Sequence, residues 1–157
     1  MSDAQLFAFE NDFVASLRCI PMAVRMKLDR CAIKLSLRQW SRFSREDRQH
    51  LLKRPCRSPT LVDAYRAGLV ELVKMRTGEN ATPLEVLSLA LQESANEVPL
   101  AVTTYARSVS VAPPTLAEWR TLDELQRFVL IKLTRDSHDN VNFIPAMQEF
   151  GLLDERG

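Results

Sequence analysis

The amino-acid sequence predicts an all-α fold: one domain over residues 1–157, built as a helical bundle of about seven to nine helices. Three observations predict it. Helix-forming residues dominate a 157-residue chain that has only four glycines. Apolar side chains recur at helical spacing in several segments. Ser, Thr and Asp stand at capping positions in front of these segments. The 46% hydrophobic and 26% charged content is that of an ordinary globular protein.

The first half of the chain predicts five helices. Apolar residues at positions 9, 13, 17 and 20 indicate a first helix, which Pro21 interrupts. A second helix is expected over residues 20–35, where a proline suits the first turn. Its apolar face consists of Ile20, Val24, Leu28, Cys31 and Leu35. Two short helices follow. A fifth helix is expected from Pro59 or Thr60 to Thr77, with Gly78 as its C-terminal stop.

Capping signals mark where the short helices begin. Ser36 with Gln39 three residues later is a capping box, and Ser44 with Asp47 is a near relative of one. The helix that follows Ser44 should end at Pro55.

The second half predicts a short helix at 83–92, a helix near 97–110, and a start at Thr115 with a capping box to Glu118. The last long helix should begin at Asp123. A polar loop then leads to a short final helix, FIPAMQEF, with Gly151 at its end.

Residues 20–53 and 98–132 form an internal repeat. One inserted residue aligns them with eight identities in 33 or so pairs, among them Trp40 with Trp119, the only two tryptophans of the chain. Each copy reads as a helix, a short helix and a helix, and the two copies are expected to pack together. The tryptophan is expected to pack where the three helices meet. A stacking platform for a base or cofactor is the alternative.

The two halves differ sharply in charge. Residues 18–57 hold 12 basic and 3 acidic residues, a net charge of +9, whereas residues 58–157 hold 9 basic and 14 acidic residues, a net of −5. The candidate docking residues are Arg18, Arg25, Lys27, Arg30, Lys34, Arg38, Arg42, Arg45 and Arg48.

Three interpretations of this basic segment compete. It forms a solvated surface, it docks an acidic protein partner, or it binds nucleic acid as part of a regulator. The pI of 7.7 argues against nucleic acid, because binding domains typically exceed a pI of about 9.

Few residues suggest catalysis. The sequence has no glycine-rich phosphate loop, no H-E-x-x-H and no C-x-x-C, and His50 and His138 are far apart; His50 is expected to face solvent. One polar cluster stands out: Asp136, His138, Asp139, Asn140 and Asn142. It suggests either metal binding or acid–base work, or a loop whose side chains cap the last helix. We expect no enzyme activity and no cofactor.

The three cysteines do not form a recognisable framework. Cys19, Cys31 and Cys56 match neither a disulfide pattern nor a zinc pattern. Cys31 is expected to be a buried thiol that packs like a small apolar residue. Metal or redox binding by the cysteines is the alternative.

No apolar run approaches the roughly 18 residues that a membrane span requires. The N-terminus, MSDAQLFAFENDF, has no basic segment of the kind found in secretory signals. These features predict a cytoplasmic protein with no membrane contact.

Two stretches resemble a known family. FENDFVASLRCIPMAVRMKLDRCAIKLSLRQWSRFS at residues 9–44 is similar to the opening motif of the nitrate reductase-associated protein family, and LQRFVLIKLTRDSHDNVNFIPAMQEFGL at residues 125–152 is similar to its closing motif. The resemblance implies a non-enzymatic accessory or assembly factor that supports a molybdenum-containing assimilatory nitrate reductase. The implied partners are the reductase or its maturation or electron-donor proteins. The resemblance carries over no functional residues.

Overall fold

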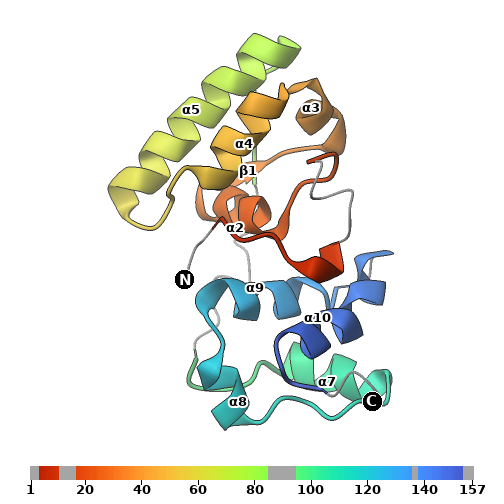
Figure 1. Cartoon of the computed structure of the whole chain (residues 1–157). Helices are drawn as coiled ribbons and strands as arrows, with labels where there is room; N and C mark the ends of the chain where they lie inside the picture. Colours follow the sequence, from red (N-terminus) through yellow and green to blue (C-terminus); the bar gives the residue numbers. More distant parts are fainter. Residues whose placement is uncertain (1–3, 11–16, 85–94, 136–137, 154–157) are drawn as a thin grey trace. The chain divides into compact units, whose positions relative to one another are not determined.

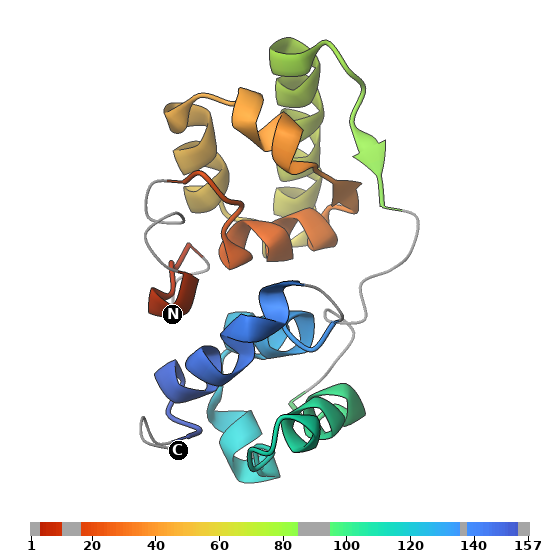
Figure 2. The ribbon, with the colours of Figure 1, turned by 90° about the vertical axis from the view of Figure 1, so that its right-hand side faces the viewer.

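The computed structural model describes residues 4–10, 17–84, 95–135 and 138–153, without the side chains of residues 138 and 139. These residues contain eight α-helices, two 3-10 helices and one two-stranded sheet (Figure 1, Figure 2). The prediction of an all-α fold is confirmed. None of the described helices is long and apolar enough to cross a membrane.

The chain divides into two compact units, Met1–Ser88 and Leu89–Gly157. The prediction of a single domain stays a prediction. The elements of unit 1 are η1 (Ala8–Glu10), α2 (Met22–Arg30), β1 (Ile33–Lys34), α3 (Leu37–Arg42), α4 (Arg45–Lys53), α5 (Pro59–Thr77) and β2 (Thr82–Pro83). Those of unit 2 are α7 (Leu100–Ser108), α8 (Leu116–Thr121), α9 (Glu124–Lys132), η2 (His138–Asn142) and α10 (Phe143–Glu149).

The internal repeat is confirmed at the level of helices. Helices α2, α3 and α4 have 9, 6 and 9 residues, and α7, α8 and α9 have the same lengths in the same order. Four of these six helices begin with a complete capping box, at Ser36, Ser44, Thr115 and Asp123. Local capping rules therefore set the same helix starts in both copies.

Both tryptophans are core residues, as predicted. Trp40 and Trp119 are each 0% exposed, which leaves no ring face for stacking on a ligand. The Trp40 indole Nε1 donates to the Leu17 carbonyl over 2.9 Å, so its buried polar atom is satisfied. In unit 1, α2 packs on α4 and α3 packs on α5. In unit 2, α7 and α10 pack on α9.

The long helix α5 runs as predicted from Pro59 to Thr77. Ser58 caps its first turn, and Gly78 ends it with a φ of 74°. A left-handed residue at this position favours glycine. Tyr65, Leu69 and Val73 form the fully buried face of this helix, whereas Leu61 and Leu72 are half-buried.

Two helices predicted in the first half differ from the structure. The first falls partly on residues 11–16, which lie outside the described residues. Residues 17–20 are not helical, and Leu17 has a φ of 62°. The helix expected over 20–35 ends at Arg30, because Ala32 adopts a φ of 57°. Ile33 and Lys34 then pair with Pro83 and Thr82 in an antiparallel sheet.

Helix boundaries in the second half also differ. The helix expected at 97–110 spans Leu100–Ser108, and Ser110 has a φ of 62°, like its repeat counterpart Ala32. Thr82 and Pro83 lie in β2 instead of opening a helix. The rest of the helix predicted at 83–92 falls largely outside the described residues.

Candidate functional site

Five of the nine predicted docking residues are exposed, and we call them the exposed basic set. They lie before α2, on β1, on α3 and at the start of α4: Arg18, Lys34, Arg38, Arg42 and Arg45. Arg38 and Arg42 are one helical turn apart on α3, so they share a side of that helix. Local structure thus leaves these five cations accessible to a partner.

Lys27 does not belong to a docking surface. Its side chain is 0% exposed, and Nζ donates to the Leu52 carbonyl over 2.5 Å. Lys27 was among the predicted docking residues, but it lies on the buried side of α2. A buried ammonium needs such polar contacts.

Three further arginines of the predicted set are half-buried and bind backbone carbonyls. Arg25 donates to the Ile20 carbonyl, five residues earlier in the chain, and Arg30 donates to the Cys56 carbonyl, 26 residues later. Arg48 donates to three carbonyls, which are the Trp40, Leu17 and Ser41 oxygens. These guanidinium groups bind backbone carbonyls within unit 1. These contacts account for the positions of the three arginines without a docking partner.

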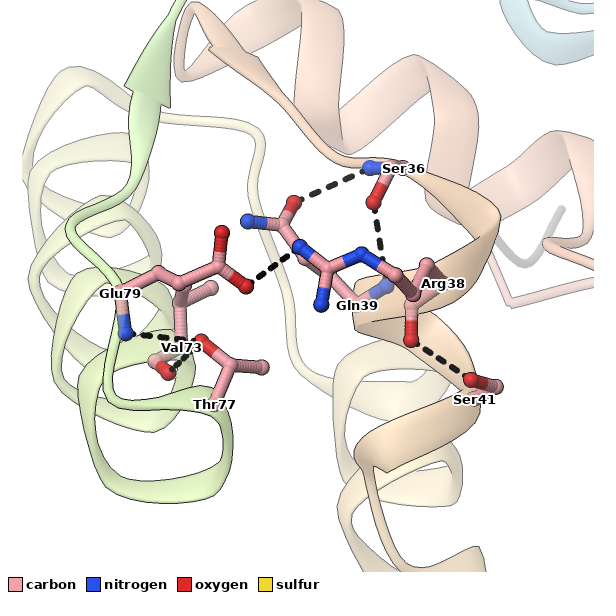
Figure 3. A network of polar contacts seen from close by, with 7 residues as sticks. All are labelled: Ser36, Arg38, Gln39, Ser41, Val73, Thr77 and Glu79. Carbon is pink, nitrogen blue, oxygen red and sulfur yellow. Dashed lines mark hydrogen bonds and ion pairs between the residues drawn. The ribbon is translucent and has the colours of Figure 1, made fainter.

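Arg38 belongs to a network that joins α3 to the end of α5 (Figure 3). Its Nη2 lies 2.5 Å from the Glu79 carboxylate, and both side chains are exposed. The Glu79 backbone N–H donates to Thr77 Oγ1, which itself donates to Val73 O. Glu79 thus offsets part of the Arg38 charge, so Arg38 contributes less to the field of the exposed basic set than Arg42 or Arg45.

The predicted polar loop is only partly described. Asp136 lies outside the described residues, and nothing is described of the side chains of His138 and Asp139. Asn140 Nδ2 donates to the Leu133 carbonyl over 2.6 Å, so it caps the end of α9. Asn142 occupies the N-cap of α10 without a side-chain hydrogen bond. The expectation that the loop caps the last helix is therefore wrong for Asn142.

The cysteines are free thiols in different environments. Cys31 and Cys56 are buried, at 2% and 0% exposure, and Cys19 is half-buried. Burial raises the pKa of the Cys31 thiol to about 11, and the neighbouring Cys56 adds to this rise. The Cys31 thiol is therefore neutral at physiological pH. The described residues contain no cluster of three or more His, Cys, Asp or Glu suited to a metal ion.

Sequence reasoning missed a groove between α4 and α5. It encloses a cavity of about 300 Å³. Its lining residues are Asp47, His50, Leu51, Arg54, Gly68, Glu71, Leu72 and Met75. His50 is exposed, as predicted. The sequence feature that could have indicated the groove is Gly68, a glycine in the middle of a long helix, where it costs about 1 kcal/mol relative to alanine.

An ion pair closes one end of the groove. Arg76 Nε lies 2.8 Å from Asp47 Oδ2, and a second hydrogen bond joins the same two side chains. Burial alone would raise the pKa of Asp47, but hydrogen bonds from Arg76 and Ser44 outweigh burial and lower the pKa below its ordinary value of 3.8. Asp47 therefore stays ionised in the folded protein at neutral pH.

Comparison with protein families shows which family this chain belongs to. A family model described as conserved nitrate reductase-associated protein matches residues 6–150. The chain belongs to this family. The match includes residues 9–44, residues 125–150 of the second resembling stretch and the segment between them. No curated protein and no solved structure matches the chain.

The family description links the protein to nitrate reductase and to an associated role. The exposed basic set and the α4–α5 groove both lie in unit 1, inside the matched region. Both are candidate contact surfaces within the described residues of this nitrate reductase-associated protein.

Proposed function

We propose that the protein is a non-enzymatic accessory or assembly factor for a molybdenum-containing assimilatory nitrate reductase, acting in the cytoplasm. The family description is the observation that carries this proposal. The partner is the reductase itself or one of its maturation or electron-donor proteins. The protein acts by binding this partner.

The exposed basic set is the proposed docking surface. Its five cations come from a segment with a net charge of +9, whereas the chain as a whole carries only +1. Such an uneven charge distribution steers encounter with an acidic partner and fixes its orientation. Lys27 is excluded by its burial, and Arg25, Arg30 and Arg48 act mainly within unit 1.

A co-purification experiment tests the proposal. The tagged protein is recovered from nuclease-treated extracts of cells grown on nitrate, at near-physiological salt, and nitrate reductase is measured in the eluate. The triple variant Lys34→Glu, Arg42→Glu and Arg45→Glu should retain about tenfold less reductase. These three residues are exposed, so the melting temperature should hardly change.

A charge-matched control separates a local surface from overall charge. Lys74, Arg107 and Arg120 are also exposed but lie outside the basic segment. Their combined substitution by glutamate changes the net charge equally and should leave reductase retention intact. Equal losses in both triple variants would contradict the docking surface. Recovery of nucleic acid without nuclease, in place of reductase, would instead support a regulator.

A further inference from the structure

The α4–α5 groove has a fixed length and two different ends. Asp47 pairs with Arg76 at one end, and Arg54 lies against Gly68 at the other. The two helices therefore run antiparallel along the groove. Asp47 and the C-cap residue Arg54 are seven positions apart along α4, which corresponds to roughly 10 Å at 1.5 Å per residue. A groove of about two helical turns suits a short peptide segment.

The Arg54 guanidinium fits at its end of the groove because Gly68 has no side chain. A Cβ atom added to Gly68 would approach the Arg54 guanidinium closely, with Nη1 as its nearest neighbour. Gly68 thus admits the guanidinium against the backbone of α5. Among the described residues, this guanidinium makes no hydrogen bond or ion pair. Its five N–H donors remain available in a half-buried position.

The other residues that line the groove add an apolar surface and further polar groups beside Arg54. Leu51 is buried, Leu72 is half-buried, and Met75 is 63% exposed, so an apolar surface adjoins Arg54. His50 is a second donor on the α4 side. Glu71 is exposed on the α5 side, and the charge of Asp47 is already matched by Arg76.

The second copy of the repeat shows the same helix face in a covered form. His50 and Arg54 align with Val129 of α9 and with Leu133, the C-cap of α9, and both of these are 0% exposed. One copy thus buries this face with apolar residues, whereas the other leaves it open with polar ones. The open face in unit 1 is therefore accessible to another molecule.

We propose that the α4–α5 groove docks a protein partner's segment that carries a glutamate or aspartate beside apolar side chains. The carboxylate binds Arg54, for which the planar guanidinium fork is suited. The apolar neighbours of that carboxylate contact Met75 and Leu72. A cavity of about 300 Å³ has room for one or two side chains. The inference rests on the proposed function only in taking the occupant to be a protein.

Peptide titration of the full-length, ¹⁵N-labelled protein tests this inference. The probe is a capped hexapeptide of alternating leucine and glutamate, and its analogues carry glutamine or lysine in place of glutamate. We expect saturable amide shifts at His50 and Gly68 with the glutamate peptide. The glutamine and lysine peptides should bind at least about tenfold more weakly, the loss expected for one charged hydrogen bond.

Three variants test the roles of individual residues of the groove. Arg54→Gln should weaken the glutamate peptide about tenfold or more. Gly68→Ala should weaken it too, because the new methyl displaces the guanidinium, yet its melting temperature should not fall. That combination separates binding from folding. Glu71→Gln should bind the peptide equally or more tightly, because it removes a like charge from the groove.

Other outcomes would overturn the inference. These are no saturable shift, preference for the lysine peptide, weaker binding by Glu71→Gln, or sodium acetate giving the same shifts at the same concentration. The last result would make the groove a site for small carboxylates. The titration contains no reductase, so a negative titration would not contradict a positive co-purification. A co-purification without reductase would likewise not contradict a positive titration.

Discussion

The third helix of each repeat copy has the same length and the same type of cap but a different environment. Helix α4 begins at the Ser44 capping box and α9 at the Asp123 capping box, and each has nine residues. Five residues of α9 are buried, whereas α4 buries only Leu51 and Leu52. Helix starts therefore depend on local sequence, while the surface each helix presents depends on what packs against it.

The largest expected effect comes from exchanging residues between the two helices. Val129→His places an imidazole at a position that is 0% exposed and should cost about 3 kcal/mol or more of unfolding free energy. The reverse change, His50→Val, affects an exposed residue and should stay within about 0.5 kcal/mol. Urea denaturation followed by tryptophan fluorescence measures both. Similar costs for the two variants would contradict the difference in environment.

A second comparison concerns the arginine that both copies place on this helix. Arg48 donates to three backbone carbonyls and lies 5.8 Å from the Trp40 ring centroid. Its counterpart Arg127 donates to Leu122 O alone among the described residues. Replacement of Arg48 by methionine should cost about 2–3 kcal/mol, and of Arg127 about 1 kcal/mol, because Arg48 supplies a charged donor to two part-buried carbonyls and Arg127 to one. Denaturation midpoints check the order, and a larger cost at Arg127 would refute it.

The third comparison predicts equal losses of stability in the two copies of the repeat. Ser44→Ala and Asp123→Ala each remove the N-cap of a capping box and should each cost about 1 kcal/mol. Ser44→Gly and Asp123→Gly are the matched controls, with losses of a few tenths of a kcal/mol. Thermal denaturation measures all four. A clear difference between the two alanine variants would show that caps act differently in the two copies.

These comparisons also show which features could be predicted from the sequence. The capping boxes at Ser36 and Thr115 depend on residues three positions apart, so local patterns identified them. Asp123 was identified as a helix start, and the structure adds its capping box with Gln126. The repeat was visible because both tryptophans occupy one position in it. By contrast, Ala32 ends α2 in a left-handed conformation that nothing in an alanine signals.

The candidate site depended on contacts between distant residues. Lys27 was assigned to a surface because its helix position gave no sign of the Leu52 carbonyl that binds it. The groove required α4 to lie beside α5, so Arg54 could not be singled out from the other basic residues of its segment. The charge of the basic segment could be counted from the sequence. Which of its residues are exposed was known only once Arg25, Arg30 and Arg48 had been placed.

The smallest expected effect concerns Asp47, whose copy-2 counterpart is the uncharged Gln126. Hydrogen bonds from Arg76 and Ser44 hold the pKa of Asp47 below 3.8. A lowered pKa in the folded state stabilises the protein at neutral pH, and this contribution is lost as pH falls through that pKa. Asp47→Asn should therefore lower the melting temperature slightly at pH 7, since the pair is near the surface. The difference from wild type should shrink below pH 3.8 and disappear at lower pH. Gln126→Ala, which removes the equivalent capping group without a charge, should show no such pH dependence. A deficit of Asp47→Asn that persists unchanged below pH 3 would mean that packing, rather than the carboxylate charge, supplies the stability.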